Sequence, residues 1–266
     1  MALTINQNTS ALIAAKMLEK ADTELTDALE RMATGQKINS AADDASGMTI
    51  ADSLKSQSLA TGQEIKNAND NLSITQTADG ALGQITDLLQ DIRTQAVDAA
   101  GGSHSQESLA AIQSDIQGSL DTINDIAGTT SYNGQKLLDG TYNNRGLSIS
   151  SANPSTLGSQ ETGFLSDINV TTTEGARQTI KTLDLALDQI AQNRSSVGAG
   201  QNQYTSDINN LSTTQINLMA SESEIRDADI AEESILLNQM KLLKGAATFA
   251  LNQSNASRDT LVDLLG

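Results

Sequence analysis

The side chains best suited to catalysis are scarce in this sequence. It has one histidine, His104, and no cysteine. A histidine serves as a general base when a serine, a cysteine or an acid lies within hydrogen-bond reach and a third group orients the ring. We find no serine or aspartate pattern that completes such a set around His104, which lies in the polar stretch 101–105. We therefore predict a solvent-exposed loop histidine and a protein without enzymatic activity.

Two pairs of acidic residues could bind a metal ion. They are Asp43 with Asp44, and Asp227 with Asp229. A calcium loop spaces several oxygen ligands along the chain and closes with a glutamate, and neither pair extends into that pattern. Aspartate is also a frequent helix cap. We predict helix caps and intersubunit hydrogen bonds at these positions, with no metal and no cofactor.

The composition favours long, thin helices over a wide globular core. Of the 266 residues, 38% are hydrophobic but only 2% are aromatic, and the single proline is Pro154 in the middle of the chain. The formal net charge of −17 disfavours binding to nucleic acid or anionic membranes, because both require clustered Lys and Arg. No disulfide framework, cleavable secretory signal or membrane-spanning stretch is visible in the sequence.

Both ends of the chain carry apolar heptads. Near the N-terminus, small and apolar residues follow steps of three and four: Ala11, Ala14, Leu18, Ala21, Leu25, Ala28 and Met32. Near the C-terminus two columns repeat every seven residues: Leu236, Leu243, Ala250, Ser257 and Leu264, and Met240, Ala247, Ser254 and Leu261. Such stripes need partners. We predict terminal helices that pack closely against each other and against neighbouring molecules.

The middle of the chain predicts three more helices around a small β region. The first helix should stop before Gly35, and Ser40–Asp43 predicts a capping box that starts the second helix. The remaining expected elements are a second helix up to Gly101, a third over about 106–127, a β-hairpin region over about 130–173 and a fourth helix over about 174–225. The predicted fold is mostly α: a long coiled-coil bundle rod with the two termini paired at one end.

Polar residues interrupt the stripe of the fourth predicted helix. They are Arg194, Gln201, Gln215 and Glu222. One interpretation is a bundle with a partly wet face. The other is that these residues set the register of packing, because a buried polar residue at a core position specifies register at a cost in stability.

Four short segments resemble the signature motifs of bacterial flagellins, the subunits of the flagellar filament. They are residues 38–47 (INSAADDASG), 77–82 (TADGAL), 130–138 (TSYNGQKLL) and 223–231 (SEIRDADIA). The resemblance covers nearly the whole chain except about residues 141–173. Many flagellins insert extra outer domains where this chain has only a short connection, so the resemblance implies a minimal subunit.

The resemblance also implies a domain organisation and an interface. Residues 1–40 and 226–266 would form the two halves of an inner-tube coiled coil, and residues 41–225 an outer-tube helical bundle. The polymerisation interface would comprise small and apolar residues of the terminal helices: Ala11, Ala14, Leu18, Ala21, Leu25, Ala28, Met32, Leu236, Met240, Leu243, Ala247, Ala250, Leu261 and Leu264.

The partners and location implied by the resemblance are those of a swimming propeller. The subunit would form a homo-polymer outside the cell, in the flagellar filament used for motility. It would be secreted by the flagellar type III export machinery, guarded in the cytoplasm by an export chaperone on the C-terminal helix, and assembled between filament cap and hook-junction proteins. Two alternatives remain open at this point: a hook-filament junction protein, and a signalling coiled-coil hairpin.

Finally, the resemblance implies a surface for an innate immune receptor that recognises many flagellins. In strongly recognised members, an arginine matches Asp91, a leucine matches Gln95 and a glutamate matches Asp115, whereas Arg93 keeps the family residue. Asp91 reverses a charge and Gln95 removes an apolar anchor. Weak or absent recognition is therefore expected.

Overall fold

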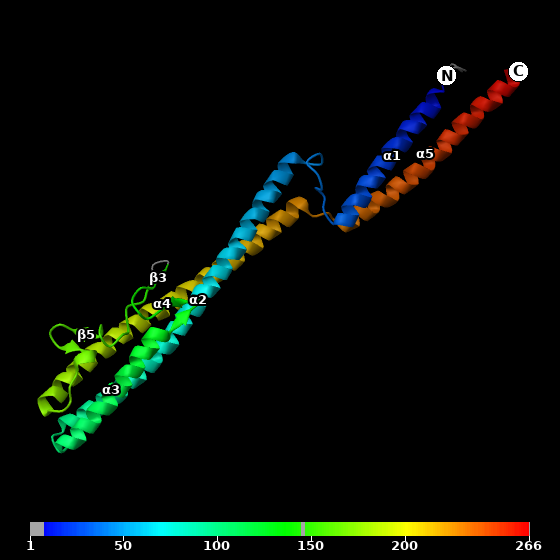
Figure 1. Cartoon of the computed structure of the whole chain (residues 1–266). Helices are drawn as coiled ribbons and strands as arrows, with labels where there is room; N and C mark the ends of the chain where they lie inside the picture. The colour runs from blue at the N-terminus through cyan, green and yellow to red at the C-terminus, as the bar shows by residue number, and fades with distance from the viewer. Residues whose placement is uncertain (1–7, 145–146, 266) are drawn as a thin grey trace. The chain divides into compact units, whose positions relative to one another are not determined.

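The computed structural model describes residues 8–144 and 147–265, and over these residues the fold is mostly α, as predicted (Figure 1). The helices are α1 (Thr9–Thr34), α2 (Ala45–Ala100), α3 (Gln106–Thr129), α4 (Thr173–Arg226) and α5 (Ile230–Leu265). Among the described residues, no helix is both long and apolar enough to cross a lipid bilayer.

The β region between α3 and α4 consists of three separate antiparallel hairpins. Their strands are β1 (Ser131–Tyr132) with β2 (Gln135–Lys136), β3 (Asn143–Asn144) with β4 (Leu147–Ser148), and β5 (Gly158–Ser159) with β6 (Gly163–Phe164), followed by the 3₁₀ turn η1 (Leu165–Asp167). At the first turn, Asn133 and Gly134 both have positive φ, of 49° and 79°. Asn-Gly suits such a turn because neither residue is strongly penalised there.

Glutamine side chains of the helices replace missing strand partners. The alternation at Ile168 and Val170 suggests β structure, but this segment is not a strand. Instead, Gln113 of α3 donates to Ile168 O at 3.2 Å and accepts from Val170 N at 2.7 Å. Gln189 of α4 does the same for both backbone groups of Gly158, at 3.0 and 3.1 Å. These amides satisfy backbone groups that would otherwise be left unpaired on burial.

The chain divides into two compact units. Unit 1 is formed by Met1–Ala60 and Thr214–Gly266, and unit 2 by Thr61–Thr213. The division falls within α2 and α4. The predicted domain boundary at 40/41 falls between α1 and α2, and the one at 225/226 falls at the last residue of α4. The long helices α2 and α4 therefore contribute to both units.

Unit 2 contains one large apolar core. It joins α2, α3, α4 and the hairpins, and its fully buried side chains include Leu82, Ile85, Leu89, Ile92, Ile116, Ile123, Leu138, Tyr142 and Ile190. Two ion pairs tie α2 to α4 at its edge, Arg93 with Asp184 at 2.7 Å and Arg194 with Asp79 at 3.0 Å. Large aliphatic groups removed from water supply most of the stability of such a core.

The polar residues of α4 lie differently from the predicted stripe. Arg194 is exposed, and its neighbour Asn193 is the buried polar residue, with Nδ2 at 3.4 Å from Ser150 O. The three others, Gln201, Gln215 and Glu222, are half-buried. Adjacent residues of a helix point about 100° apart, so Asn193 can face the core while Arg194 faces solvent.

The turn between α2 and α3 corrects the prediction for His104. Its side chain is only 25% exposed: Nε2 lies 3.2 Å from Asp98 Oδ2, and Nδ1 lies 3.3 Å from Ser108 Oγ. Gly102, with φ 73°, turns the chain back between the two helices and so brings these three residues together. The imidazole thus ties the last turn of α2 to the first turn of α3.

Candidate functional site

Unit 1 is built around a close pairing of the two terminal helices. Figure 1 shows α1 (blue) and α5 (orange to red) side by side, with the two chain ends at the same end of the pair. The predicted stripe on α1 faces α5: Ala14, Ala21 and Ala28 are buried, and Ala11, Leu18, Leu25 and Met32 are half-buried. Three alanines in the seam allow the helix backbones to approach closely.

The face of α5 toward α1 differs from the prediction at one of its two columns. Met240, Ala247 and Ser254 lie on it, as predicted, but the second column consists of Leu237, Lys244 and Leu251. Leu236 is half-buried beside the seam, and Leu243 and Ala250 are exposed. Leu261 and Leu264 belong to α5, but their side chains lie outside the described part of the structure.

The lysine at position 244 explains why the sequence pattern did not predict the second column of the seam. The doublets Leu236–Leu237 and Leu242–Leu243 leave the seam ambiguous by one residue, and a charged residue at 244 disfavours the column that contains it. In the structure Lys244 is half-buried and its Nζ contacts Asp22 of α1. A lysine can lie in a seam because its aliphatic stem packs while its amine reaches a partner at the edge.

Polar contacts set the register of α1 against α5 near both ends of the pair. Asn8 caps α1 by accepting from Ala11 N, and it also donates to Ser254 O at 3.1 Å. At the other end, Arg31 Nε lies 2.8 Å from Glu233 Oε1, although Nε is not aligned for a hydrogen bond. Both side chains of this ion pair are largely shielded from solvent, so breaking one partner would leave a poorly solvated charge.

The two connections between helix pairs are tied together. Gln36 and Asp227 form an isolated antiparallel bridge, and Arg226 reaches both Gln36 Oε1 at 3.2 Å and Asp52 Oδ1 at 3.1 Å. Ile38 is buried within the first connection. The segments 35–44 and 227–229 are therefore an ordered joint rather than free linkers.

Capping within this joint differs from the predicted box. Asp43 Oδ2 accepts from the amides of Asn39 and Ser40, at 3.0 and 2.8 Å, which lowers the pKa of Asp43. The cap of α2 is instead Asp44, whose Oδ1 accepts from Ser46 N and Gly47 N. The tight turn after Ser40 uses the predicted capping residues, so the helix begins at Ala45. On the other side Asp229 caps α5, which agrees with the prediction of caps at these acidic pairs.

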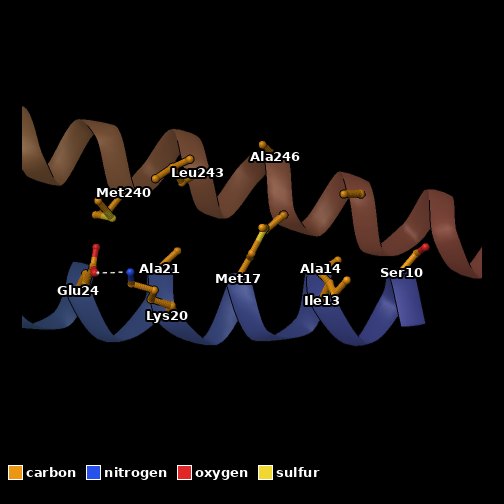
Figure 2. A pocket seen from close by; sticks show the side chains of 12 residues that line it. Ser10, Ile13, Ala14, Met17, Lys20, Ala21, Glu24, Met240, Leu243 and Ala246 are labelled. Atoms are coloured by element: carbon orange, nitrogen blue, oxygen red, sulfur yellow. Dashed lines mark ion pairs between the residues drawn. The ribbon is translucent and has the colours of Figure 1, made fainter. Parts of the chain in front are cut away.

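A groove runs along one side of the α1/α5 pair. Its volume is about 650 Å³, and Figure 2 shows Met17 reaching from α1 toward α5 and the Lys20–Glu24 ion pair at one end. The lining residues are Ser10, Ile13, Ala14, Met17, Lys20, Ala21, Glu24, Met240, Leu243, Ala246, Ala247 and Ala250. Leu243 and Ala250, absent from the seam, belong to this groove.

The outer surface of unit 1 is unusually apolar. Thirteen of the fifteen exposed large apolar side chains found among the described residues belong to this unit. The most exposed on α1 is Leu12, at 63%, and the most exposed on α5 is Leu242, at 76%. Nine of the thirteen lie on α1 and α5, and the other four on α2 and α4. Large apolar surface left in water is typical of a contact site for another molecule.

The four positions of the receptor-matching surface lie on α2 and α3 in unit 2. Asp91 and Asp115 are exposed. Arg93 is engaged by Asp184 of the same chain. Gln95 is half-buried, and its Oε1 is buried without a hydrogen-bond partner among the described residues.

Comparison with known protein families identifies the family of this chain. The bacterial flagellin N-terminal helical region matches residues 5–143, and the bacterial flagellin C-terminal helical region matches residues 180–265. The chain belongs to the bacterial flagellins. Flagellins are structural subunits that polymerise into the flagellar filament and are not enzymes. The His104 contacts are therefore structural, and the alternatives of a junction protein and a signalling hairpin gain no support.

Full-length relatives agree with this assignment. This flagellin is 26% identical to polar flagellin F of Vibrio parahaemolyticus over 377 positions and 28% identical to flagellin B of Vibrio cholerae over 376, with 100% of both chains covered in each case. It is 28% identical to flagellin FlaB1 of Treponema pallidum over 285 positions, which cover 99% of this chain and 100% of the other. The Vibrio alignments are far longer than the 266 residues of this flagellin, so those relatives carry segments that it lacks. It is a minimal flagellin.

Proposed function

We propose that the exposed apolar surface of α1 and α5 is the polymerisation interface of this flagellin. The observation that carries the proposal is the concentration of exposed large apolar side chains in unit 1, while unit 2 buries its own. Burying one such side chain contributes roughly 1.5–3 kcal/mol. Seam alanines such as Ala28 act indirectly, by holding the two helices together, and groove residues such as Leu243 act by direct contact with a neighbour.

The domain roles follow from this interface. Residues 1–40 and 226–266 form the inner tube of the filament, and residues 41–225 form the outer tube. The joint at 35–44 and 227–229 connects them. Its hydrogen bonds, including the one from Arg226 to Gln36, transmit force from one tube to the other in a rotating filament.

Truncation tests the interface directly. Removing residues 1–35 and 227–266 should leave a soluble helical monomer that does not polymerise, because the core of unit 2 remains intact. Electron microscopy and sedimentation would detect filaments, and circular dichroism would detect helix. Filaments formed by the truncated chain would refute the proposal.

Secretion and chaperone binding use the same apolar surface. In the proposal, the subunit leaves the cell unfolded through the flagellar type III export machinery and is added to an extracellular filament beneath a cap, beyond the hook-junction proteins. An export chaperone covers α5 beforehand, because exposed Leu242 and Phe249 would otherwise promote premature association. Co-purification of a chaperone with the intact chain, but not with a chain that ends at residue 226, tests this step.

The receptor-matching surface is proposed to bind the immune receptor weakly. Asp91 presents the opposite charge to an arginine, and Gln95 cannot supply the apolar anchor. Each change at an interface centre costs about 2 kcal/mol or more, which together weaken binding by a factor of roughly a thousand. Arg93 adds to the loss, because Asp184 already engages its guanidinium.

A receptor reporter assay with purified monomer tests this proposal. Potency equal to that of a strongly recognised flagellin would contradict it. The double substitution Asp91→Arg with Gln95→Leu should raise potency, and no gain would also contradict it. Asp121→Asn on the exposed surface of α3 serves as a control that should leave potency unchanged.

A further inference from the structure

One row of apolar residues on α5 takes no part in the α1/α5 seam. Ile235, Leu242 and Phe249 are spaced by seven residues and are 69%, 76% and 71% exposed. Leu242 and Phe249 each follow a buried seam residue, Met240 and Ala247, by two positions. Two positions turn a helix by about 200°, so this row, the α5 ridge, faces away from α1.

The flanks of the ridge are mostly neutral, unlike the outward face of α1. The residues three and four positions after each ridge residue are Asn238, Gln239, Gly245, Ala246, Asn252 and Gln253, all neutral. Two exposed charged residues lie nearby, Glu232 three positions before Ile235 and Lys241 next to Leu242. The outward face of α1 instead carries exposed charged residues such as Lys16, Glu19, Asp27 and Glu30. Covering the ridge therefore strips water from fewer charged groups than covering the outward face of α1 would.

The groove beside the seam matches the ridge in length and character. From Ser10 to Glu24 the groove extends over about 21 Å of helix, and from Ile235 to Phe249 the ridge also extends over about 21 Å. Met17 lies at the middle of the groove, and a flexible thioether adapts to an inserted side chain. Leu242 lies at the middle of the ridge.

We propose that the α5 ridge of one copy inserts into the α1/α5 groove of the next, with Leu242 against Met17. This inference rests on the proposed function and names the contact within that interface. On α5 the ridge residue Leu242 and the groove residue Leu243 are adjacent, so ridge and groove lie about 100° apart around the helix. A contact between two different patches is heterologous, and it propagates into an open polymer instead of closing a dimer.

Single-cysteine variants test the contact, because the natural chain has no cysteine. Met17→Cys and Leu242→Cys are purified separately, mixed in equal amounts, polymerised and oxidised with diamide. A disulfide requires Cα atoms within about 7 Å. The expected product is a dimer of one Met17→Cys chain and one Leu242→Cys chain, and each variant alone should give none. Asp27→Cys mixed with Leu242→Cys is the matched control on the outward face of α1.

Two results would overturn the contact. One is filaments in which the Met17/Leu242 mixture gives no more mixed dimer than the Asp27 control. The other is efficient dimerisation of Leu242→Cys with itself, which would make the ridge self-complementary. If the chain still polymerises, either result refutes only the ridge-and-groove contact. Filaments formed by the truncated chain would refute the proposed polymerisation interface as well.

A charge substitution gives an independent measurement. Leu242→Glu should abolish filaments while the helix content and melting temperature of the monomer stay unchanged, because Leu242 is exposed there. Lys241→Glu, at the adjacent exposed position, should still form filaments. Filaments formed normally by Leu242→Glu would overturn the contact.

Discussion

Unit 2 and unit 1 use apolar residues in opposite ways. Unit 2 buries large aliphatic side chains such as Leu89 and Ile92 completely, and of its large apolar side chains among the described residues only Val97 and Leu185 are exposed. Unit 1 buries mainly alanines in the α1/α5 seam and leaves Leu12, Leu242 and other large residues in water. Unit 2 therefore buries its apolar groups within one chain, whereas unit 1 leaves them exposed, as the proposed interface with neighbouring molecules requires.

Helix length does not account for this difference, because α2 and α4 run through both units. In unit 2 a third helix, α3, and the hairpins cover the apolar faces of these helices. The terminal helices α1 and α5 cover each other's apolar residues only along the seam where they touch. Two helices in contact always leave most of their circumference exposed, so apolar residues outside the seam can be buried only by another molecule.

The largest expected effect distinguishes seam from groove. Leu25→Asp and Leu243→Asp should both abolish filament formation, because a carboxylate in a packed apolar interface costs several kcal/mol, of order 3–5. In the monomer, Leu25→Asp should also separate α1 from α5, because Leu25 is half-buried in the seam, whereas Leu243→Asp should leave the pair intact. Electron microscopy and amide hydrogen exchange measure the two effects.

The matched control for both variants is Thr23→Asp, an exposed position on the outward face of α1. It introduces the same charge and should still permit filaments. Normal filaments from Leu243→Asp, or equal loss of filaments from Thr23→Asp, would contradict the assignment of the groove to assembly.

A large-to-small substitution in unit 2 should destabilise the monomer strongly. Leu89→Ala should lower the free energy of unfolding by about 2–5 kcal/mol, because the side chain is fully buried and leaves a cavity. Met17→Ala, at a residue 62% exposed in unit 1, should change it by less than about 0.5 kcal/mol. Thermal and denaturant unfolding of the monomer compare the two variants. Equal destabilisation would remove the contrast between the units.

A smaller, local effect is expected where Gln189 holds the third hairpin. Gln189→Leu should cost about 1–3 kcal/mol, because the buried backbone groups of Gly158 lose both hydrogen bonds. The amide of Gly158 should then exchange faster with solvent. Gln192→Leu, at an exposed position on the same helix, should leave that exchange rate unchanged.

The smallest effect concerns acid sensitivity of the joint in unit 1. The amides of Ser40 and Asn39 hold the pKa of Asp43 below its ordinary value of 3.8. Because the pKa of Asp43 is lower in the folded chain than in the unfolded chain, its carboxylate stabilises the fold above the unfolded pKa. That contribution is lost as pH falls through the lowered pKa of the folded state. Asp43→Asn should therefore be less stable than the natural chain at pH 6, and the difference should shrink below about pH 4.

Denaturant unfolding from pH 2.5 to 7 measures this difference, with amide exchange in residues 35–44 as the local probe. Asp139→Asn is the comparator in unit 2, where the hydroxyl and amide of Thr141 lower the pKa of Asp139. It should affect exchange around Thr141 and leave the joint unchanged. A pH-independent effect of Asp43→Asn would show that lost packing, rather than charge, explains it.

Much of this fold and its role could be predicted from the sequence alone. The three-and-four spacing from Ala11 to Met32 predicted both the helix and the face that meets α5, because helix periodicity is a local property. Gly35 predicted the end of α1, where φ is 72°. The four family motifs predicted a flagellin, and the low aromatic content predicted thin helices in place of a wide core. None of these conclusions needed a long-range contact.

Other features depend on contacts between residues far apart in the sequence, so they could not be predicted from local patterns. Leucine doublets left the α5 seam ambiguous, and pairing with α1 placed Leu237 and Lys244 in it. His104 joined Asp98 and Ser108 because the chain turns back at Gly102. Gln113 and Gln189 bound the backbone of the β region, which no periodicity predicts, because a side-chain amide can replace a strand wherever packing brings it within reach. Local spacing determines which face of a helix is apolar, whereas tertiary packing determines which apolar residues remain exposed for assembly.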